Sequence, residues 1–139
     1  MDSNLALTPH SDPRLDLLRA YVTHAVLALA NGGVHVERSW LDPFDPRDAT
    51  IVCVGRGGTL TGLVWDEETG WRRGTFVAGQ PGERTVLRGV GHLCGGLLPS
   101  GETLARRFAE GVRQPEQKYR RYTDLRDGLD TALAAISLA

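Results

Sequence analysis

Lysine is almost absent from this 139-residue chain: Lys118 is the only one, and the other fifteen basic residues are arginine. Seventeen acidic residues balance them, so the formal net charge is −1 and no overall field attracts nucleic acid or an acidic membrane. Aromatic residues make up only 6% of the chain, and no apolar run reaches the length of a membrane span. The composition therefore indicates an ordinary globular domain and excludes a binder that relies on a large net positive charge.

Cysteine is scarce as well, with only Cys53 and Cys94, and both lie in apolar surroundings. The opening residues lack the basic start and the apolar run of a secretory signal. We expect a cytoplasmic protein whose two cysteines are reduced and buried. Residues 1–11 are expected to form a flexible N-terminal arm. The length of the chain predicts a single domain over residues 12–139, large enough to bury a core.

The clearest secondary-structure signal lies between residues 12 and 33. Ser11 or Asp12 can cap a helix, Pro13 suits its first turn, and Gly32 and Gly33 end it. Apolar residues recur between these limits with helical spacing, which predicts an amphipathic helix. They are Leu15, Leu18, Tyr21, Val22, Ala25, Val26 and Leu29.

Short segments with a period of two follow this helix. They are separated by turn signals, of which the clearest are RGG at 56–58, DEETG at 66–70 and QPGE at 80–83. Two further helices are predicted, one over 101–112 and a long one over 114–139. The expected fold is α+β, with an antiparallel meander of four to five strands and the N-terminal and two C-terminal helices packed on one face.

The segment LVWDEETGWRRG holds Trp65 and Trp71 on either side of an acidic turn. Its first interpretation is a hairpin, in which the two rings stack across the strands and add about 0.5–1.5 kcal/mol beyond their buried area. Its second interpretation is a binding surface made by Trp65, Trp71, Arg72 and Arg73, because tryptophan and arginine dominate interface hot spots.

A second unusual segment, GVGHLCGG, places His92 and Cys94 among four glycines. If it is a strand, both side chains point the same way. A nucleophilic Cys–His pair needs an orienting third group, and a zinc site needs two more ligands; the sequence supplies neither. We therefore predict no metal and no cofactor, and keep as an alternative a ligand pocket or minor enzyme site near His92, Cys94 and Trp71.

The long helix predicted over 114–139 would exceed what a small sheet needs for cover. Its apolar stripe is therefore a candidate homodimer interface, made by Tyr122, Leu125, Leu129, Leu133 and Ile136. Basic residues interleaved with Tyr119 and Tyr122 leave nucleic-acid binding as a further alternative. These residues are Arg106, Arg107, Arg113, Lys118, Arg120, Arg121 and Arg126, although acidic residues interrupt them.

Three segments carry a resemblance to a known family: LRAYV in the first helix, LVWDEETGW, and LPSGETLARRF. In this order they resemble a family of small actinobacterial proteins that contain a domain of unknown function. The resemblance covers residues 14–112 and leaves the last helix outside. It implies a fold and a kind of genome, but it implies no catalytic residue.

Taken together, these patterns favour a non-enzymatic cytoplasmic module that binds another protein and forms a homodimer. A ligand-binding domain or minor enzyme near His92 and Cys94 is the first alternative. A nucleic-acid-binding regulator that uses the basic C-terminal helix is the second.

Overall fold

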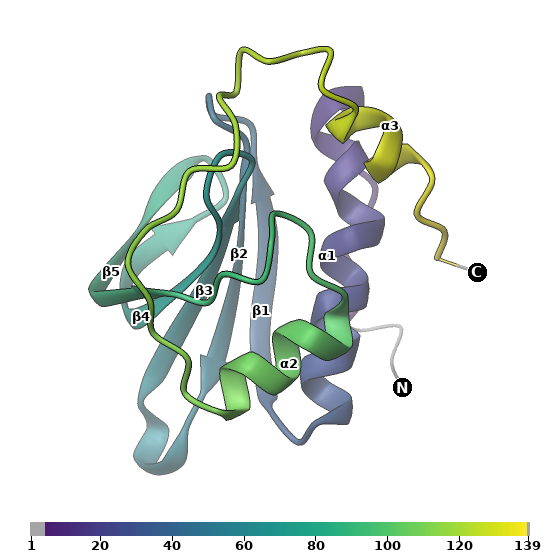
Figure 1. Cartoon of the computed structure of the whole chain (residues 1–139). Helices are drawn as coiled ribbons and strands as arrows, with labels where there is room; N and C mark the ends of the chain where they lie inside the picture. The colour runs from purple at the N-terminus through teal and green to yellow at the C-terminus, as the bar shows by residue number, and fades with distance from the viewer. Residues whose placement is uncertain (1–4, 139) are drawn as a thin grey trace.

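The computed structural model describes residues 5–138 (Figure 1). Its longest helix, α1 (Pro13–Asn31), packs along one face of the sheet. Of the two predicted caps, Asp12 is the one used: its carboxylate accepts the backbone N–H of Arg14 at 2.9 Å. The helix ends at Gly32, and Gly33 follows with a φ of 89°, which glycine adopts without strain. Every residue of the predicted apolar stripe is buried.

The sheet is a five-stranded antiparallel meander in which each strand pairs with its neighbours in the sequence, and this confirms the predicted fold. A short 3-10 turn at Arg56–Gly58 joins the second strand to the third. The strands are β1 (His35–Asp42), β2 (Asp48–Val54), β3 (Leu60–Asp66), β4 (Gly70–Gln80) and β5 (Glu83–His92).

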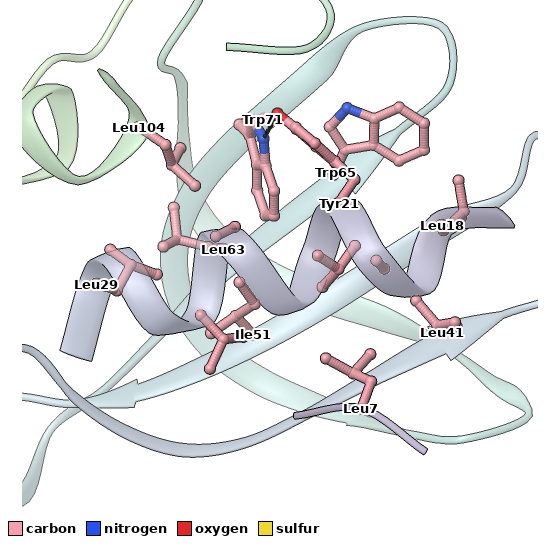
Figure 2. Close-up of a cluster of buried hydrophobic side chains, with 14 of the residues drawn as sticks. Leu7, Leu18, Tyr21, Leu29, Leu41, Ile51, Leu63, Trp65, Trp71 and Leu104 are labelled. Atoms are coloured by element: carbon pink, nitrogen blue, oxygen red, sulfur yellow. Dashed lines mark hydrogen bonds between the residues drawn. The ribbon is translucent and has the colours of Figure 1, made fainter. Parts of the chain in front are cut away.

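The main core lies between α1 and one face of the sheet (Figure 2). Trp65 and Trp71 are cross-strand partners, and each ring packs on Tyr21, with ring centres 6.1 and 6.3 Å apart. The Tyr21 hydroxyl donates to the carbonyl of Pro99 at 2.6 Å and accepts the indole N–H of Trp71 at 3.0 Å. The hairpin is therefore fixed by its tryptophans, as expected, but they act through Tyr21.

The opposite face of the sheet is covered by the sheet itself. The outer half of the β4–β5 hairpin folds back over Trp40, Val52 and Val64, which are buried yet lie outside the main core. Phe76 packs edge-on against Trp40 with ring centres 6.4 Å apart. The Thr50 and Thr85 hydroxyls meet at 2.6 Å. The molecule therefore has a second, smaller core.

Two glycines permit this close packing. A Cβ at Gly62 would overlap Leu87 Cδ2, and one at Gly74 would lie 2.9 Å from the carbonyl oxygen of Arg88. The atom opposite Gly74 belongs to the backbone and cannot easily move, so the curl of the hairpin depends on glycine there, whereas a side chain at position 62 would require only the end of Leu87 to move.

The remaining helices are short. Helix α2 (Gly101–Ala109) is capped by the Ser100 hydroxyl, and both α2 and α3 (Leu129–Ala134) pack against α1 (Figure 1). The prediction of one long helix over 114–139 is wrong, because residues 115–128 are irregular. Nowhere in residues 5–138 does a helix combine the length and apolarity that a membrane span requires.

The N-terminal segment is not a free arm where the structure describes it. Leu7 is 9% exposed and belongs to the main core, and its N–H donates to the Thr23 hydroxyl at 3.2 Å. The N–H of His10 donates to Asp16 at 2.9 Å. Residues 5–10 are thus anchored on α1, while residues 1–4 of the predicted arm lie outside the described residues.

Tyr21→Phe should lower the free energy of unfolding by about 1–3 kcal/mol, because it leaves the buried indole N–H of Trp71 and the Pro99 carbonyl without a partner. Urea denaturation measures the change. Tyr122→Phe is the matched control, since Tyr122 is exposed, and its effect should stay within about 0.5 kcal/mol. Equal stability of the two variants would show that the Tyr21 hydroxyl does not hold the core together.

Candidate functional site

The turn between β3 and β4 satisfies its own polar groups. The Asp66 carboxylate accepts the N–H groups of Glu68 and Thr69, both at 2.8 Å, and the Thr69 hydroxyl at 2.6 Å. It also pairs with the Arg72 guanidinium at 2.7 Å. The first acid of DEETG is therefore committed to the geometry of the turn.

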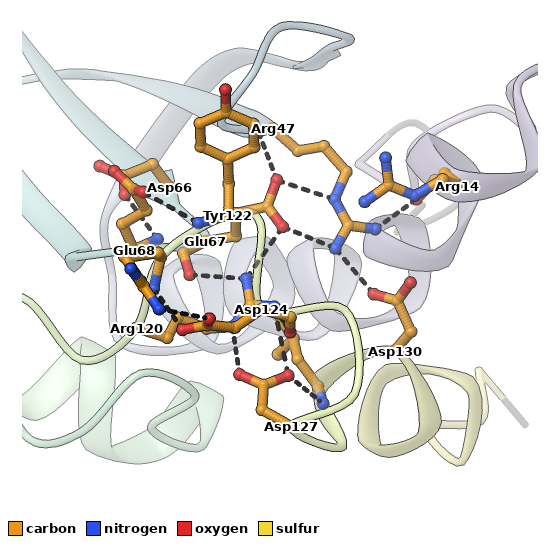
Figure 3. A network of polar contacts seen from close by, with 12 residues as sticks. Arg14, Arg47, Asp66, Glu67, Glu68, Arg120, Tyr122, Asp124, Asp127 and Asp130 are labelled. Atoms are coloured by element: carbon orange, nitrogen blue, oxygen red, sulfur yellow. Dashed lines mark hydrogen bonds and ion pairs between the residues drawn. The ribbon is translucent and has the colours of Figure 1, made fainter.

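The second acid, Glu67, is fully buried although it occupies a turn (Figure 3). Arg47 binds it in a forked arrangement, with Nη2 2.8 Å from Oε1 and Nε 3.0 Å from Oε2. Arg120 Nη1 reaches Oε1 at 3.0 Å. Burial acts to raise the pKa of Glu67, but the hydrogen bonds from Arg47 and Arg120 outweigh it and hold the pKa below its usual value.

The two arginines carry this contact to distant parts of the chain. Arg47 Nη2 pairs with Asp130 at 2.7 Å, and its Nη1 donates to the carbonyl of Arg14 at 2.8 Å. Arg120 pairs with Asp127 and donates to the carbonyl of Asp124 at 2.7 Å. One buried carboxylate thereby joins the β1–β2 loop, the hairpin turn, the start of α1 and the C-terminal segment (Figure 3).

The same turn explains why no long C-terminal helix forms. The N–H of Tyr119 donates to the carbonyl of Glu68 at 2.8 Å, and that of Tyr122 donates to the Glu68 carboxylate at 2.9 Å. These donors bond to the hairpin turn and so do not close helical turns of their own. Gly128, with a φ of 92°, then starts α3 from a left-handed conformation.

The predicted homodimer stripe does not exist as a surface. Leu129 and Leu133 are 6% and 1% exposed in the chain's own core, and Ile136 packs against that core. Tyr122 and Leu125 are exposed, but they lie on the irregular segment. The continuous helix on which the interface prediction relied does not form, because residues 115–128 are irregular.

The predicted binding surface of the hairpin is mostly interior. Trp65 and Trp71 are 0% and 1% exposed. Arg72 is paired with Asp66, while Arg73 lies 4.3 Å from the centre of the Phe108 ring and donates to the Phe108 carbonyl at 2.8 Å. These residues hold the hairpin and α2 in place and leave no tryptophan for a partner.

His92 and Cys94 do not act as a pair. Strand β5 ends at His92, and Cys94 has a left-handed φ of 58°, so strand alternation does not align their side chains. The His92 ring is buried, its Nε2 lies 3.8 Å from Glu116, and burial lowers its pKa. Across residues 5–138, no group of three histidine, cysteine or acidic side chains could hold a metal ion.

The basic residues predicted for nucleic acid are largely used inside the chain. Lys118 pairs with Glu68 at 3.7 Å and Arg121 with Asp124 at 3.4 Å, while Arg120 is buried on Glu67. Arg107 and Arg113 donate to backbone carbonyls. Over residues 115–138, no continuous basic track therefore follows the C-terminal segment.

A groove lies along the outer edge of β1. This strand pairs with β2 on one side, and within residues 5–138 no backbone hydrogen bond joins its other side to the rest of the chain. The groove has a volume of about 600 Å³, and residues 36–41 of β1 form its floor. Residues 5–8 and His10 border it on the side of α1.

The second wall comes from the other face of the sheet. It consists of Pro43 and of Pro81 and Gly82 at the tip of the β4–β5 hairpin. Apolar side chains dominate both walls, whereas Glu37 and Arg38 pair on the floor at 3.7 Å and are nearly half exposed. A free strand edge between apolar walls offers backbone hydrogen bonds and side-chain burial together.

Two buried acids lie directly behind this second wall. Asp42 and Asp48 are the pair of opposed residues next to the β1–β2 loop, and they are 0% and 2% exposed, respectively. Asp42 accepts the Trp40 indole N–H at 3.0 Å and the Gly82 N–H at 3.1 Å. Burial and the neighbouring Asp42 charge raise the pKa of Asp48 to about 7.

Sequence reasoning missed both the groove and the acid pair. The groove combines three distant segments, so no local pattern announces it. The acid pair had a usable signal, since Asp42 and Asp48 flank the loop of a predicted hairpin, where like charges oppose each other and are destabilising unless neutralised.

The chain belongs to the Family of unknown function (DUF6292), whose model matches residues 21–110. No curated protein and no solved structure matches the chain. The matched range contains both Arg47 and Glu67, the acid pair and the floor of the groove, whereas Arg120 lies beyond it.

Glu67→Gln should lower the free energy of unfolding by about 3–5 kcal/mol, because it leaves two buried guanidinium groups without their carboxylate. It should also speed tryptic cleavage at Arg121 and Arg126, since the C-terminal segment loses its anchor. Urea denaturation and limited proteolysis measure these effects. The pKa of Glu67 is lowered, so its contribution is present above its ordinary value of 4.5 and is lost as the pH falls through the lower folded value.

Glu37→Gln provides the control, because the exposed Glu37–Arg38 pair is expected to contribute less than about 1 kcal/mol. If Glu67→Gln unfolds and is cleaved like the control, the buried pairs do not anchor the C-terminal segment.

Proposed function

We propose that this chain is a protein-interaction module that binds an extended segment of a partner protein along the free edge of β1. The observation that carries the proposal is that this edge forms the floor of a groove with a wall on each face of the sheet. An added strand would receive backbone hydrogen bonds from β1, and its alternate side chains would meet the two walls.

The shape of the groove favours a single extended segment over a second copy of the chain. Residues 5–8 and Pro81 project beside the edge on opposite faces of the sheet. In a symmetric pair of β1 edges, these walls would meet the same walls of the other copy. A peptide strand has no such walls and enters freely.

The floor of the groove also limits uncontrolled pairing. A bulge interrupts the register between Val36 and Arg38, and charged side chains occupy this end of the strand. Bulges and charges on edge strands protect proteins from aggregation. The regular stretch from Arg38 to Leu41 is then left to receive a partner of matching length.

Apolar lining defines the partner class. Leu5, Ala6, Pro43 and Pro81 line the walls, Val36 adds an apolar side chain on the floor, and the Glu37–Arg38 pair leaves the floor near neutrality. The segment that fits is uncharged at its centre and apolar at alternate positions.

Cys53 and Cys94 are free thiols, which supports the cytoplasm as the compartment of this module.

Selection of displayed random 12-residue peptides on the immobilised protein tests the proposal. We expect enriched peptides with apolar residues at alternate positions. Two synthetic versions of that peptide are compared, one methylated on the odd-numbered backbone nitrogens and one on the even-numbered backbone nitrogens. One version should bind at least tenfold more weakly than the unmodified peptide, and the other should keep its affinity. The reason is that only every second N–H group of an added strand faces β1 and bonds to it, so methylation matters only at those positions.

Ala6→Glu places a charge on an exposed wall position and should weaken the peptide at least tenfold. Ala109→Glu, an exposed alanine at the end of α2, should leave its affinity unchanged. The proposal would be overturned if both methylated peptides bound as tightly as the unmodified one, or if Ala6→Glu did not weaken binding. A wild-type dimer that Ala6→Glu dissociates would instead identify a second copy as the occupant.

A further inference from the structure

The tip of the β4–β5 hairpin is attached to the sheet through acids. The N–H of Gly82 donates to Asp42 at 3.1 Å, and the Arg84 guanidinium contacts Asp48 Oδ2 at 3.1 Å. The Thr50–Thr85 hydrogen bond and the hydrogen bond from Arg84 to the Asp45 carbonyl are further polar links at this end of the hairpin. Since Pro81 and Gly82 form one wall of the groove, whatever holds the tip also shapes the groove.

The attachment contains an electrostatic conflict. Asp42 and Asp48 oppose each other across β1 and β2, and both residues are almost fully buried. Two ionised carboxylates at opposed positions in a buried site repel each other, so the pair favours holding one proton. Within residues 5–138 no group donates a hydrogen bond to the buried Asp48 Oδ1, so this atom is free to carry that proton.

The charged groups around the pair come from every neighbouring strand. Asp66 on β3 is the cross-strand neighbour of Asp48, and Arg72 on β4 neutralises Asp66 at 2.7 Å. Arg84 on β5 is the cation in direct contact with the pair, and its side chain is 48% exposed. From the β1–β2 loop, Asp45 presents its backbone carbonyl to Arg84. Three acids, Asp42, Asp48 and Asp66, therefore face two arginines in this region. One of these arginines, Arg84, is about half exposed to solvent.

We propose that protonation of the Asp42–Asp48 pair gates the groove: with one shared proton the hairpin tip is docked and the groove is complete, and loss of that proton releases the tip. This inference rests on the proposed function, because it assigns a regulation to the same groove. Release lets water reach both carboxylates and separates Gly82 from Asp42, so the wall made by Pro81 and Gly82 is lost.

The direction of the effect follows from proton linkage. Burial and the charge of Asp42 raise the pKa of Asp48 to about 7 in the docked form, whereas release returns it towards its ordinary value of 3.8. The docked form therefore binds the proton more tightly than the released form. Docking is favoured at pH values below about 7 and weakens as the pH rises through that value.

Hydrogen exchange of the Gly82 amide between pH 6 and 9 tests the gate on the protein alone. After correction for intrinsic exchange, opening of the tip should increase above pH 7 by up to tenfold per pH unit, the limit for one proton. Asp48→Asn keeps the shape of the protonated acid and should remove this dependence. Asp42→Asn should do the same, and it provides a second route if the first variant fails to fold.

Asp45→Asn is the matched control, because this loop acid is exposed and contributes only its backbone carbonyl. It should follow the wild-type pH profile. A Gly82 amide whose protection does not change with pH in the wild type, or changes equally in Asp48→Asn, would overturn the gate whether or not any peptide binds.

The affinity of the display-selected peptide should fall over the same pH range in the wild type and stay constant in Asp48→Asn. If the affinity stays constant with pH in the wild type while the tip opens, then the tip does not control binding in the groove, and the gating of binding is overturned. Failure of the selection to yield any peptide would count against the proposed function, while the exchange experiment would still decide whether the acid pair controls the tip.

Discussion

The carboxylate of Glu67 is the contact on which the arrangement of this molecule depends. It lies at the top of a hairpin, the least protected place in a sheet, and is nevertheless fully buried because Arg47 and Arg120 close over it. A buried charge of this kind is stable only while both cations stay in place. The C-terminal segment, which supplies Arg120, Asp127 and Asp130, is therefore ordered by an acid more than fifty residues earlier in the chain.

The sheet meets a different constraint, because five strands with helices on one face leave the other face uncovered. Here the long β4–β5 hairpin covers it by curling back, and Gly62 and Gly74 make room for Leu87 and Arg88. The apolar contacts of Trp40 with Phe76 fix the middle of the curl. Its tip is held mainly by hydrogen bonds, an ion pair and the contact of Arg84 with the Phe44 ring, which makes the tip the least stable part of the cover.

Local patterns in the sequence predicted the elements that are stabilised locally. The stripe of α1 and the turns of the meander follow from spacing and from turn residues, and both are confirmed. The segment after Gln114 has helical spacing too, but the N–H groups of Tyr119 and Tyr122 find acceptors on Glu68. Helical propensity gains little per residue, so a few specific tertiary bonds override it. The groove was beyond sequence reasoning for the same cause: its floor and walls meet only after the sheet has curled.

A binding edge on such a scaffold needs a rigid floor and an adjustable wall. The floor is β1, backed by the main core through Leu41 and by the second core through Trp40. The wall is the hairpin tip, attached through the carboxyl pair behind it, where the like charges of Asp42 and Asp48 offset part of the attraction to Arg84. Replacing Asp42 with an apolar residue would remove this conflict, but it would also remove the acceptor that positions Gly82. The acid pair is thus best understood as a compromise that keeps the wall attached and leaves it able to move.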